Sequence, residues 1–192
     1  LCRTLPVALG AGVYQINLLV DTIIASFLPE GSISYLFFAD RINQLPLGVV
    51  GVAVGTALLP LLSRQIRAGD HVAAQNSQNR AVEFSILLTL PAACALFVMS
   101  DPVVKVLFQR GIFGDMQASA TATALAILTL GLPAYVLIKT LAPGFFARGD
   151  TVTPVKIAFI AVVANVVLSL ILMGPFLHLG VAIATTASSW LN

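Results

Sequence analysis

Long runs without a charged side chain divide this sequence. No Lys, Arg, Asp or Glu occurs in residues 42–63, 84–100, 116–138 or 157–192. A helix needs about 20 mostly apolar residues to cross the hydrocarbon core of a bilayer, which is ~30 Å thick. The pattern therefore predicts membrane-spanning helices. A transmembrane β-barrel would show segments of about ten residues with alternating polarity, and the sequence has no such segments.

Turn residues between these runs set the limits of six expected membrane helices. They are predicted at about residues 6–28, 34–62, 81–99, 118–145 and 154–173, with a sixth beginning near residue 179. Between the second and third helices, residues 63–80 are polar and predict the one clearly aqueous segment. Residues 101–114 mix apolar and charged side chains, which is typical of a short helix at the membrane interface.

The composition supports an all-α, polytopic transmembrane bundle. Apolar residues make up 58% of the chain and charged residues only 9%. Soluble domains carry about 25% charged residues, so this chain could not cover a water-exposed surface. The net charge of +2 is spread over the loops and favours no partner; no nucleic-acid partner is expected. The two cysteines, Cys2 and Cys94, have neither disulfide-framework nor metal-site spacing.

The positions of Lys and Arg predict the orientation. One end of the helices receives six of them and the other end receives Lys105 and Arg110, so the first end is expected in the cytoplasm. The six are Arg3, Arg64, Arg67, Arg80, Arg148 and Lys156.

Asp40 and Arg41 lie inside the second predicted helix. Arg41 is about seven residues from its start, or ~10 Å at 1.5 Å per residue. Ionisable groups within a membrane helix are costly and indicate a functional site by default. One interpretation is an arginine that extends to the surface or pairs with Asp40. The other is a guanidinium in a hydrated cavity, where its planar fork can hold phosphate oxygens. Neighbouring helix positions diverge by ~100°, which weakens a local pair.

Lys139 lies near the inner end of the fourth predicted helix, between apolar neighbours. Its ammonium can extend to the cytoplasmic surface or face a cavity. In the second helix, Gly48, Gly51 and Gly55 have the small-residue spacing that predicts close helix packing.

A polar set is expected near the bilayer midplane. If the last two helices form a hairpin centred on Pro175, Asn165 lies level with Thr185, ten residues or ~15 Å from the turn, and Ser169 lies level with Val181. Asp21, nine residues before Glu30, has a similar depth. Carboxylate, amide and hydroxyl oxygens suit a small cation. The alternative is hydrogen bonding between helices with a protonated Asp21.

The sequence carries no HExxH motif, nucleophile elbow or phosphate-binding glycine loop. Nothing argues for an enzyme, and no cofactor is expected apart from Na⁺ or H⁺ as a coupling ion.

Two segments resemble the MviN/MurJ family of bacterial lipid II flippases, which belongs to the multidrug/oligosaccharidyl-lipid/polysaccharide exporter superfamily. They are residues 35–60, which contain Ala-Asp-Arg and Gln-Leu-Pro-Leu-Gly-Val-Val-Gly, and residues 141–157, which contain Leu-Ala-Pro-Gly-Phe-Phe-Ala-Arg and Thr-Pro-Val-Lys. The order and spacing match over essentially the whole chain. The resemblance implies a multi-pass protein of the bacterial inner membrane that moves lipid-linked peptidoglycan precursor outward by alternating access.

The resemblance also implies a domain assignment and roles for several residues. Residues 1–192 would be helices seven to twelve of fourteen, the C-terminal lobe, without the N-terminal lobe that partners it and without the last two helices. A fragment is also expected because the chain begins at Leu1 near a helix and stops inside an apolar segment. Arg41 would contact the pyrophosphate of lipid II. Asp40 and Lys139, as ionisable groups in apolar helices, are expected as further substrate-binding residues. A sodium site described for some members would fall on Asp21, Asn165, Ser169, the Val181 carbonyl and Thr185. A second aspartate expected there is Ser169 in this chain, which weakens the prediction of Na⁺.

Two alternatives stay open at this point. The chain could be part of another exporter of the superfamily, for drugs or O-antigen lipid. It could also be a membrane scaffold without transport, in which Arg41 would be buried by lipid or protein.

Overall fold

The computed structural model describes residues 22–24, 26–29, 31–111 and 113–192, with only the backbone at residue 52. Most of the first predicted helix, residues 6–21 and 25, therefore lies outside the described residues. The described elements are helices, with no strand among them. They are α2 (Ser32–Pro46), the π-helix η1 (Leu47–Val52), α3 (Ala53–Arg67), α4 (His71–Val98), α5 (Ser100–Phe108), α6 (Asp115–Ala147), α7 (Val152–Phe176) and α8 (His178–Leu191).

Four helices in the described part of the chain are long and apolar enough to cross a membrane. α2, η1 and α3 together form the first, a 36-residue span, and α4, α6 and α7 are the others. The all-α prediction and its helix order are confirmed for the described residues. The sixth predicted helix, expected from near residue 179, is α8, which begins at His178 and is helical to Leu191.

Residues 63–80, predicted to be aqueous and outside the membrane helices, are mostly helical. α3 continues to Arg67 and α4 begins at His71, so only three residues form the turn. Asp70 caps α4 by accepting a 2.9 Å hydrogen bond from the Ala73 amide, and Gly69 adopts φ +77°, which glycine tolerates best. Hydropathy marks the part of a helix that lies in lipid, but a polar helix can continue into water because its backbone remains satisfied.

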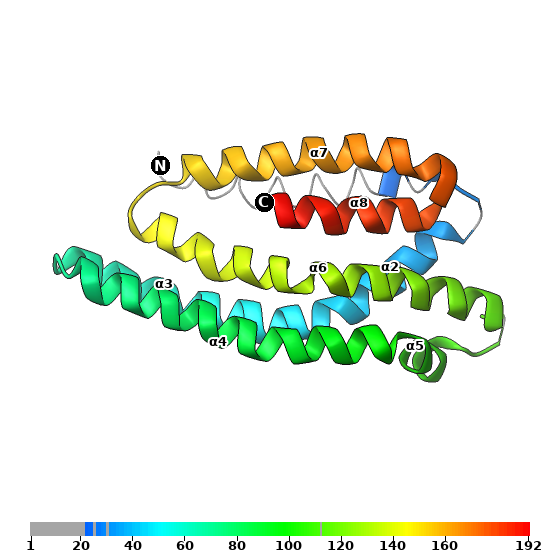
Figure 1. Cartoon of the computed structure of the whole chain (residues 1–192), viewed down its shortest axis with the longest axis horizontal. Coiled ribbons are helices and arrows are strands. Elements are labelled where there is room, and N and C mark those ends of the chain that lie inside the picture. Colours follow the sequence, from blue (N-terminus) through cyan, green and yellow to red (C-terminus); the bar gives the residue numbers. More distant parts are fainter. Residues whose placement is uncertain (1–21, 25, 30, 112) are drawn as a thin grey trace.

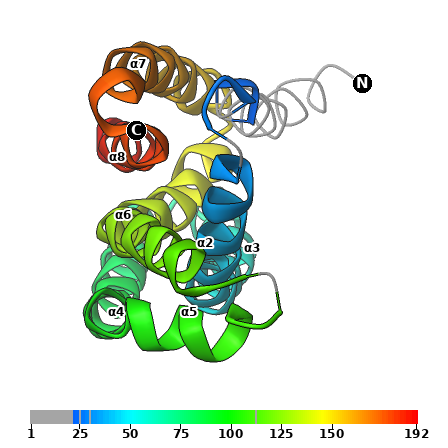
Figure 2. The same ribbon diagram turned by 90° about the vertical axis from the view of Figure 1, so that its right-hand side faces the viewer.

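The helices form two layers around α6 (Figures 1 and 2). The α7–α8 hairpin lies on one side of α6, and α2, α3 and α4 lie on the other. In the most apolar 18-residue stretch of each span, 61% of α6 is buried but only 17% of α4 and of α7. α6 is therefore the packing centre, and α4 and α7 turn most of their surface outward.

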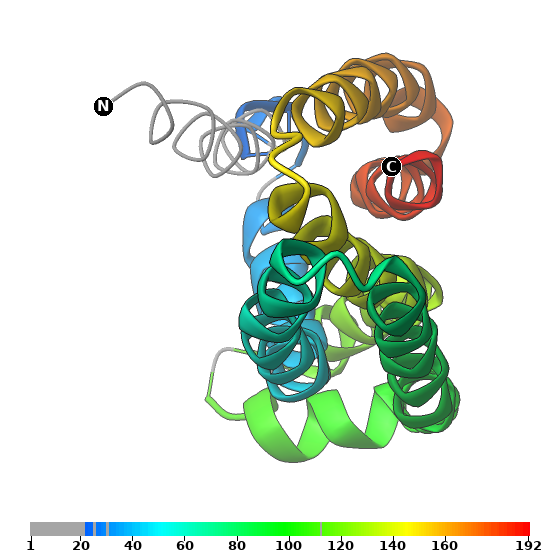
Figure 3. The same cartoon turned by 90° about the vertical axis from the view of Figure 1, so that its left-hand side faces the viewer.

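α5 confirms the predicted short helix between the third and fourth spans. It lies crosswise at the end of the bundle opposite the α3–α4 turn (Figure 3). Lys105 and Arg110 lie at that end, whereas the described members of the six-residue basic set lie toward the other end; Arg3 lies outside the described residues. Phe108 and Phe113 contact Phe38 of α2, with ring centroids 4.6 and 5.7 Å apart.

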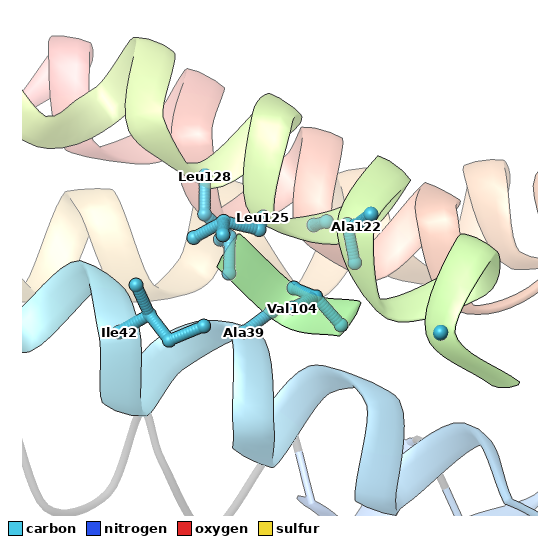
Figure 4. Packing of buried hydrophobic residues seen from close by; sticks show 9 residues of the cluster. Ala39, Ile42, Val104, Ala122, Leu125 and Leu128 are labelled. Carbon is cyan, nitrogen blue, oxygen red and sulfur yellow. The ribbon is translucent and has the colours of Figure 1, made fainter. Parts of the chain in front are cut away.

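The main apolar cluster joins α2, α5, α6 and α8 (Figure 4). Ala39 and Ile42 of α2 meet Leu125 and Leu128 of α6, and Val104 of α5 closes the cluster. Small residues on α6 let the helices approach closely, as in other membrane bundles. This packing fixes the rotation of α2, and with it the directions in which the neighbouring polar residues point.

Candidate functional site

A cavity of about 710 Å³ lies among α2, α6, α7 and α8. Its wall is mostly apolar. The polar side chains in the described part of the wall include Asp40 and Asn43 from α2, Lys139 from α6, and Thr185 and Ser188 from α8. Apolar walls with a few placed polar groups are typical of ligand sites.

Asp40 and Arg41 point to different faces of α2. Asp40 lines the cavity and accepts a hydrogen bond from Gln44, one turn further along. Arg41 is exposed and is not among the lining residues. Its guanidinium carbon lies 4.7 Å from the ring centroid of Phe37, which does line the cavity. Arg41 thus lies beside the cavity, on an exposed stripe with Phe37 and Leu45.

No ion pair joins Asp40 to Arg41. Within the described residues the structure contains one ion pair, from Lys105 to Asp101 of α5, at 2.8 Å. Among the described residues, the guanidinium of Arg41 interacts with the face of the Phe37 ring. The N–H groups along its edge therefore remain open to oxygen ligands.

Lys139 lines the cavity from α6, and its side chain is exposed. Its aliphatic stem lies over Gly51, where a Cβ would come within 3.0 Å of the lysine Cδ. A Cβ on Gly55 would lie 3.1 Å from the Lys139 carbonyl oxygen. Pro143 lacks the amide that would otherwise bond this carbonyl. The predicted close packing holds at these two glycines; at Gly48 nothing lies within 4 Å.

The predicted cation site lies between α7 and α8, except for Asp21, which is outside the described residues. Asn165 and Ser169 are fully buried and, with Ala161, form the buried stripe of α7. α7 packs mainly on α8, which contributes the buried Val181. The Thr185 hydroxyl donates to the Val181 carbonyl at 2.9 Å, and the Tyr135 hydroxyl donates to the Thr185 carbonyl at 3.4 Å.

The hairpin register differs from the prediction. Pro175 belongs to α7, and the turn residue is Leu177, with φ 51°. Gly180 lies against Leu172, whereas a hairpin centred on Pro175 would set it against residue 170. Each residue of α8 therefore lies opposite an α7 residue two positions later than predicted, which is a shift of ~3 Å along the helix. This is less than one helical turn, so the four described members still lie at similar depths along the hairpin.

The side-chain oxygens of the predicted cation site between α7 and α8 only partly match the ligands that a cation needs. The Ser169 hydroxyl oxygen is buried without a hydrogen-bond partner among the described residues, which suits an oxygen ligand. No group of three or more His, Cys, Asp or Glu side chains gathers anywhere in the described part of the chain. Any Na⁺ would therefore depend on Asp21 for its carboxylate.

Sequence reasoning missed Asn43. It is 2% exposed, lines the cavity one turn after Asp40, and its side-chain oxygen has no hydrogen-bond partner among the described residues. The three-residue spacing from Asp40 was the available signal, because positions i and i+3 share a helix face.

The contact between α4 and α6 also buries polar groups, and several of these are paired, although the Gln78 side-chain oxygen has no hydrogen-bond partner among the described residues. The hydroxyls of Ser85 and Thr140 lie 3.0 Å apart, and the Gln78 amide donates to the Thr140 carbonyl at 2.8 Å. Bonds of this kind join membrane helices.

His178 begins α8, at the turn outside the membrane-length helices. Its ring meets Tyr35 of α2 edge-on, with centroids 5.5 Å apart. Burial lowers the pKa of His178, and a hydrogen bond to the backbone of Ala120 opposes that shift. The side chain thus joins α8 to both α2 and α6 at the end of the bundle where α5 lies.

Comparison with known proteins decides the family. A model of the family described as lipid II flippase MurJ matches residues 1–192. The chain belongs to the lipid II flippase MurJ family. Among curated relatives, the probable lipid II flippase MurJ of Rhizobium meliloti is 53% identical over 192 residues, which are 100% of this chain and 36% of that protein. The lipid II flippase MurJ of Burkholderia cenocepacia is 34% identical and is covered to 37%. The chain thus spans little more than a third of these MurJ relatives.

Solved structures agree with the MurJ assignment. A lipid II flippase MurJ in an inward closed conformation matches 92% of this chain and 37% of its own, at 32% identity and a TM-score of 0.84. An outward-facing multidrug transporter of the MATE family matches 98% of this chain and 41% of its own at a TM-score of 0.86. Its 19% identity supports the exporter fold alone. The MurJ-family chain is a multi-pass protein of the inner membrane, with several apolar helices of membrane length.

Proposed function

We propose that the complete protein of which this chain is part moves lipid II from the inner to the outer leaflet of the cytoplasmic membrane. The match to the MurJ family over all 192 residues supports this proposal most strongly. The activity transfers a lipid-linked precursor across the bilayer without making or breaking a covalent bond. The N-terminal lobe of the same protein would supply the facing wall of the transport path.

Arg41 would hold the pyrophosphate of lipid II. Its exposed guanidinium is always charged and offers several N–H donors in a fork that matches phosphate oxygens. The contact with Phe37 restricts the side chain, so less conformational freedom is lost when the anion binds. Lys139 would add a second positive charge, and Asp40 an acceptor within the cavity.

Asp21, Asn165, Ser169, Val181 and Thr185 would couple the cycle to Na⁺ or H⁺. A bound cation neutralises Asp21 and would favour one of the two access states. A bias of a few kcal/mol suffices for such switching. Ser169 offers a hydroxyl where a second carboxylate is expected, so we propose weak Na⁺ affinity in this chain.

Reconstitution of the complete protein tests the substrate. Translocation of lipid II in vesicles supports the proposal, whereas transport of drugs or O-antigen lipid in place of lipid II supports the alternative exporter. A scaffold would transport none of these. In a flippase-depleted strain, Arg41→Ala should fail to restore growth at normal expression, and full restoration would contradict the role of Arg41.

Two variants test the coupling ion. Asp21→Asn should remove the ion dependence of lipid II transport, and retention of that dependence would argue against coupling at this site. Ser169→Asp should strengthen the response of transport to Na⁺, because it restores the expected second carboxylate.

A further inference from the structure

Asn43 is a buried amide that the packing of the bundle does not explain. It lies on α2 between the buried apolar residues Ala39 and Leu47, four positions away on either side. Its exposed fraction is 2%, and its side-chain oxygen has no hydrogen-bond partner among the described residues. A buried acceptor left in this state costs free energy, and most such groups in native proteins are satisfied. An aliphatic side chain would fill the position at lower cost.

The cavity provides the missing explanation. Asn43 and Asp40 both line its wall, and their spacing places them on one face of α2. Gln44 donates to one of the two oxygens of Asp40. On the α2 wall of the cavity, Asp40 and the Asn43 oxygen are therefore the hydrogen-bond acceptors, whereas the guanidinium of Arg41 lies on another face of the same helix and can only donate.

We propose that Asn43, together with Asp40, binds hydroxyl or amide N–H donors in the saccharide–peptide head group of the substrate. This inference rests on the proposed function and assigns a specificity-determining role to Asn43. An ionised pyrophosphate carries acceptors and no donors, so it cannot satisfy the Asn43 oxygen. Sugar hydroxyls and amide N–H groups can. α2 would then recognise two parts of one substrate, the phosphates through Arg41 and the head group through the face with Asn43.

The test compares two ligands on the complete protein. Dissociation constants are measured for lipid II and for undecaprenyl pyrophosphate, which has the same lipid and phosphates but no head group. Asn43→Leu should weaken lipid II binding about tenfold, because a site that loses a matched polar contact discriminates at this scale. Its affinity for undecaprenyl pyrophosphate should not change. Arg41→Ala should weaken the binding of both ligands.

Thr89→Val is the matched control. The Thr89 hydroxyl is also buried without a hydrogen-bond partner among the described residues, but Thr89 does not line the cavity. Its substitution should leave both dissociation constants unchanged. Retained binding of undecaprenyl pyrophosphate shows that Asn43→Leu is folded.

Each remaining outcome contradicts a specific statement. Unchanged lipid II binding in Asn43→Leu overturns the role of Asn43, and so does an equal loss for both ligands. If the unsubstituted protein binds neither ligand, the proposed function itself fails. If it binds both, and Arg41→Ala weakens both but Asn43→Leu behaves like the unsubstituted protein, the proposed function stands without this inference.

Discussion

The α4–α6 interface and the α2 wall of the cavity both bury polar groups, but in different ways. Between α4 and α6, Ser85 and Thr140 share a 3.0 Å hydrogen bond, and the Gln78 amide nitrogen donates to the Thr140 carbonyl. Only the Gln78 oxygen of these three side chains has no hydrogen-bond partner among the described residues. On the cavity wall, the Asn43 oxygen has no hydrogen-bond partner among the described residues. Beside the cavity, the guanidinium of Arg41 contacts the ring of Phe37. The first region joins two helices through hydrogen bonds, and the second has unused hydrogen-bonding groups in or beside a cavity, which we propose bind a ligand.

Thr89 shows that a missing partner alone does not identify a binding site. Its hydroxyl is buried on α4 without a hydrogen-bond partner among the described residues, yet the cavity wall does not include it. The distinction therefore rests on two observations together: an unsatisfied polar group and a cavity that a ligand can enter. The predictions below test this distinction, from the largest expected effect to the smallest.

Arg41→Ala should weaken lipid II binding by the complete protein about 10- to 150-fold. Hydrogen bonds to a charged group contribute about 1.5–3 kcal/mol, and ~1.4 kcal/mol corresponds to a factor of ten. The measurement is a binding titration with purified protein. Arg67→Ala is the control, because Arg67 is exposed on the same span and donates to the Ser63 carbonyl. A similar loss in both variants would indicate a general charge effect.

Gly180→Ala should lower the free energy of unfolding by about 1–3 kcal/mol, as overpacking of a close contact does. A Cβ at Gly180 would lie 2.5 Å from the Leu172 carbonyl carbon and 2.9 Å from the Met173 nitrogen. Because these are backbone atoms, α7 and α8 must separate. Gly174→Ala serves as the control, since nothing lies within 4 Å of its Cβ position. Equal stability of the two variants in denaturant unfolding would contradict the close α7–α8 contact.

Thr140→Val should cost about 1 kcal/mol of stability, because it leaves the buried Ser85 hydroxyl without this partner. Lipid II affinity should stay unchanged, because Thr140 acts in packing. Thr89→Val makes the same substitution at an unpaired hydroxyl and should be neutral or stabilising. If Thr140→Val reduced lipid II binding as strongly as Arg41→Ala, the separation between the two regions would fail.

The smallest expected effect is a pH dependence from His178. Burial lowers its pKa in the folded protein, so the neutral ring is favoured there relative to the unfolded chain. Stability should therefore be complete above the ordinary histidine pKa of about 6.5 and decrease as the pH falls through the lower folded value. His178→Gln should reduce this slope in pH-dependent unfolding, and His71→Gln at the α3–α4 turn is the matched control. Equal slopes in the two variants would contradict the contribution of His178.

The sequence predicted the helices better than it predicted their ends and register. Uncharged runs identify spans because lipid excludes charge, so the order of the spans was predictable. The extension of α4 back to His71 was not, because polar residues continue a helix in water without an apolar signal. Pro175 lies within the last turn of α7, so the hairpin turn comes later, at Leu177. A proline in the sequence does not show whether it lies in the last turn of a helix or in the loop that follows.

The candidate site was predictable where charge marks it. Asp40, Arg41 and Lys139 are conspicuous in apolar helices, and the structure places all three in or beside one cavity. Asn43 was missed because an uncharged amide does not interrupt a hydrophobic pattern. Only the rotation of α2, set by Ala39 and Ile42 against α6, directs Asn43 into the cavity.

Thiol labelling at position 41 of the complete protein tests the central claim most directly. All cysteines of the complete protein, including Cys2 and Cys94, are first replaced by serine, and Arg41→Cys is introduced into that background. A membrane-impermeant, water-soluble maleimide should then react with the cysteine at position 41, and added lipid II should slow the reaction. Absence of labelling in the membrane, with full labelling after denaturation, would show that position 41 faces lipid or packed protein and would contradict the account.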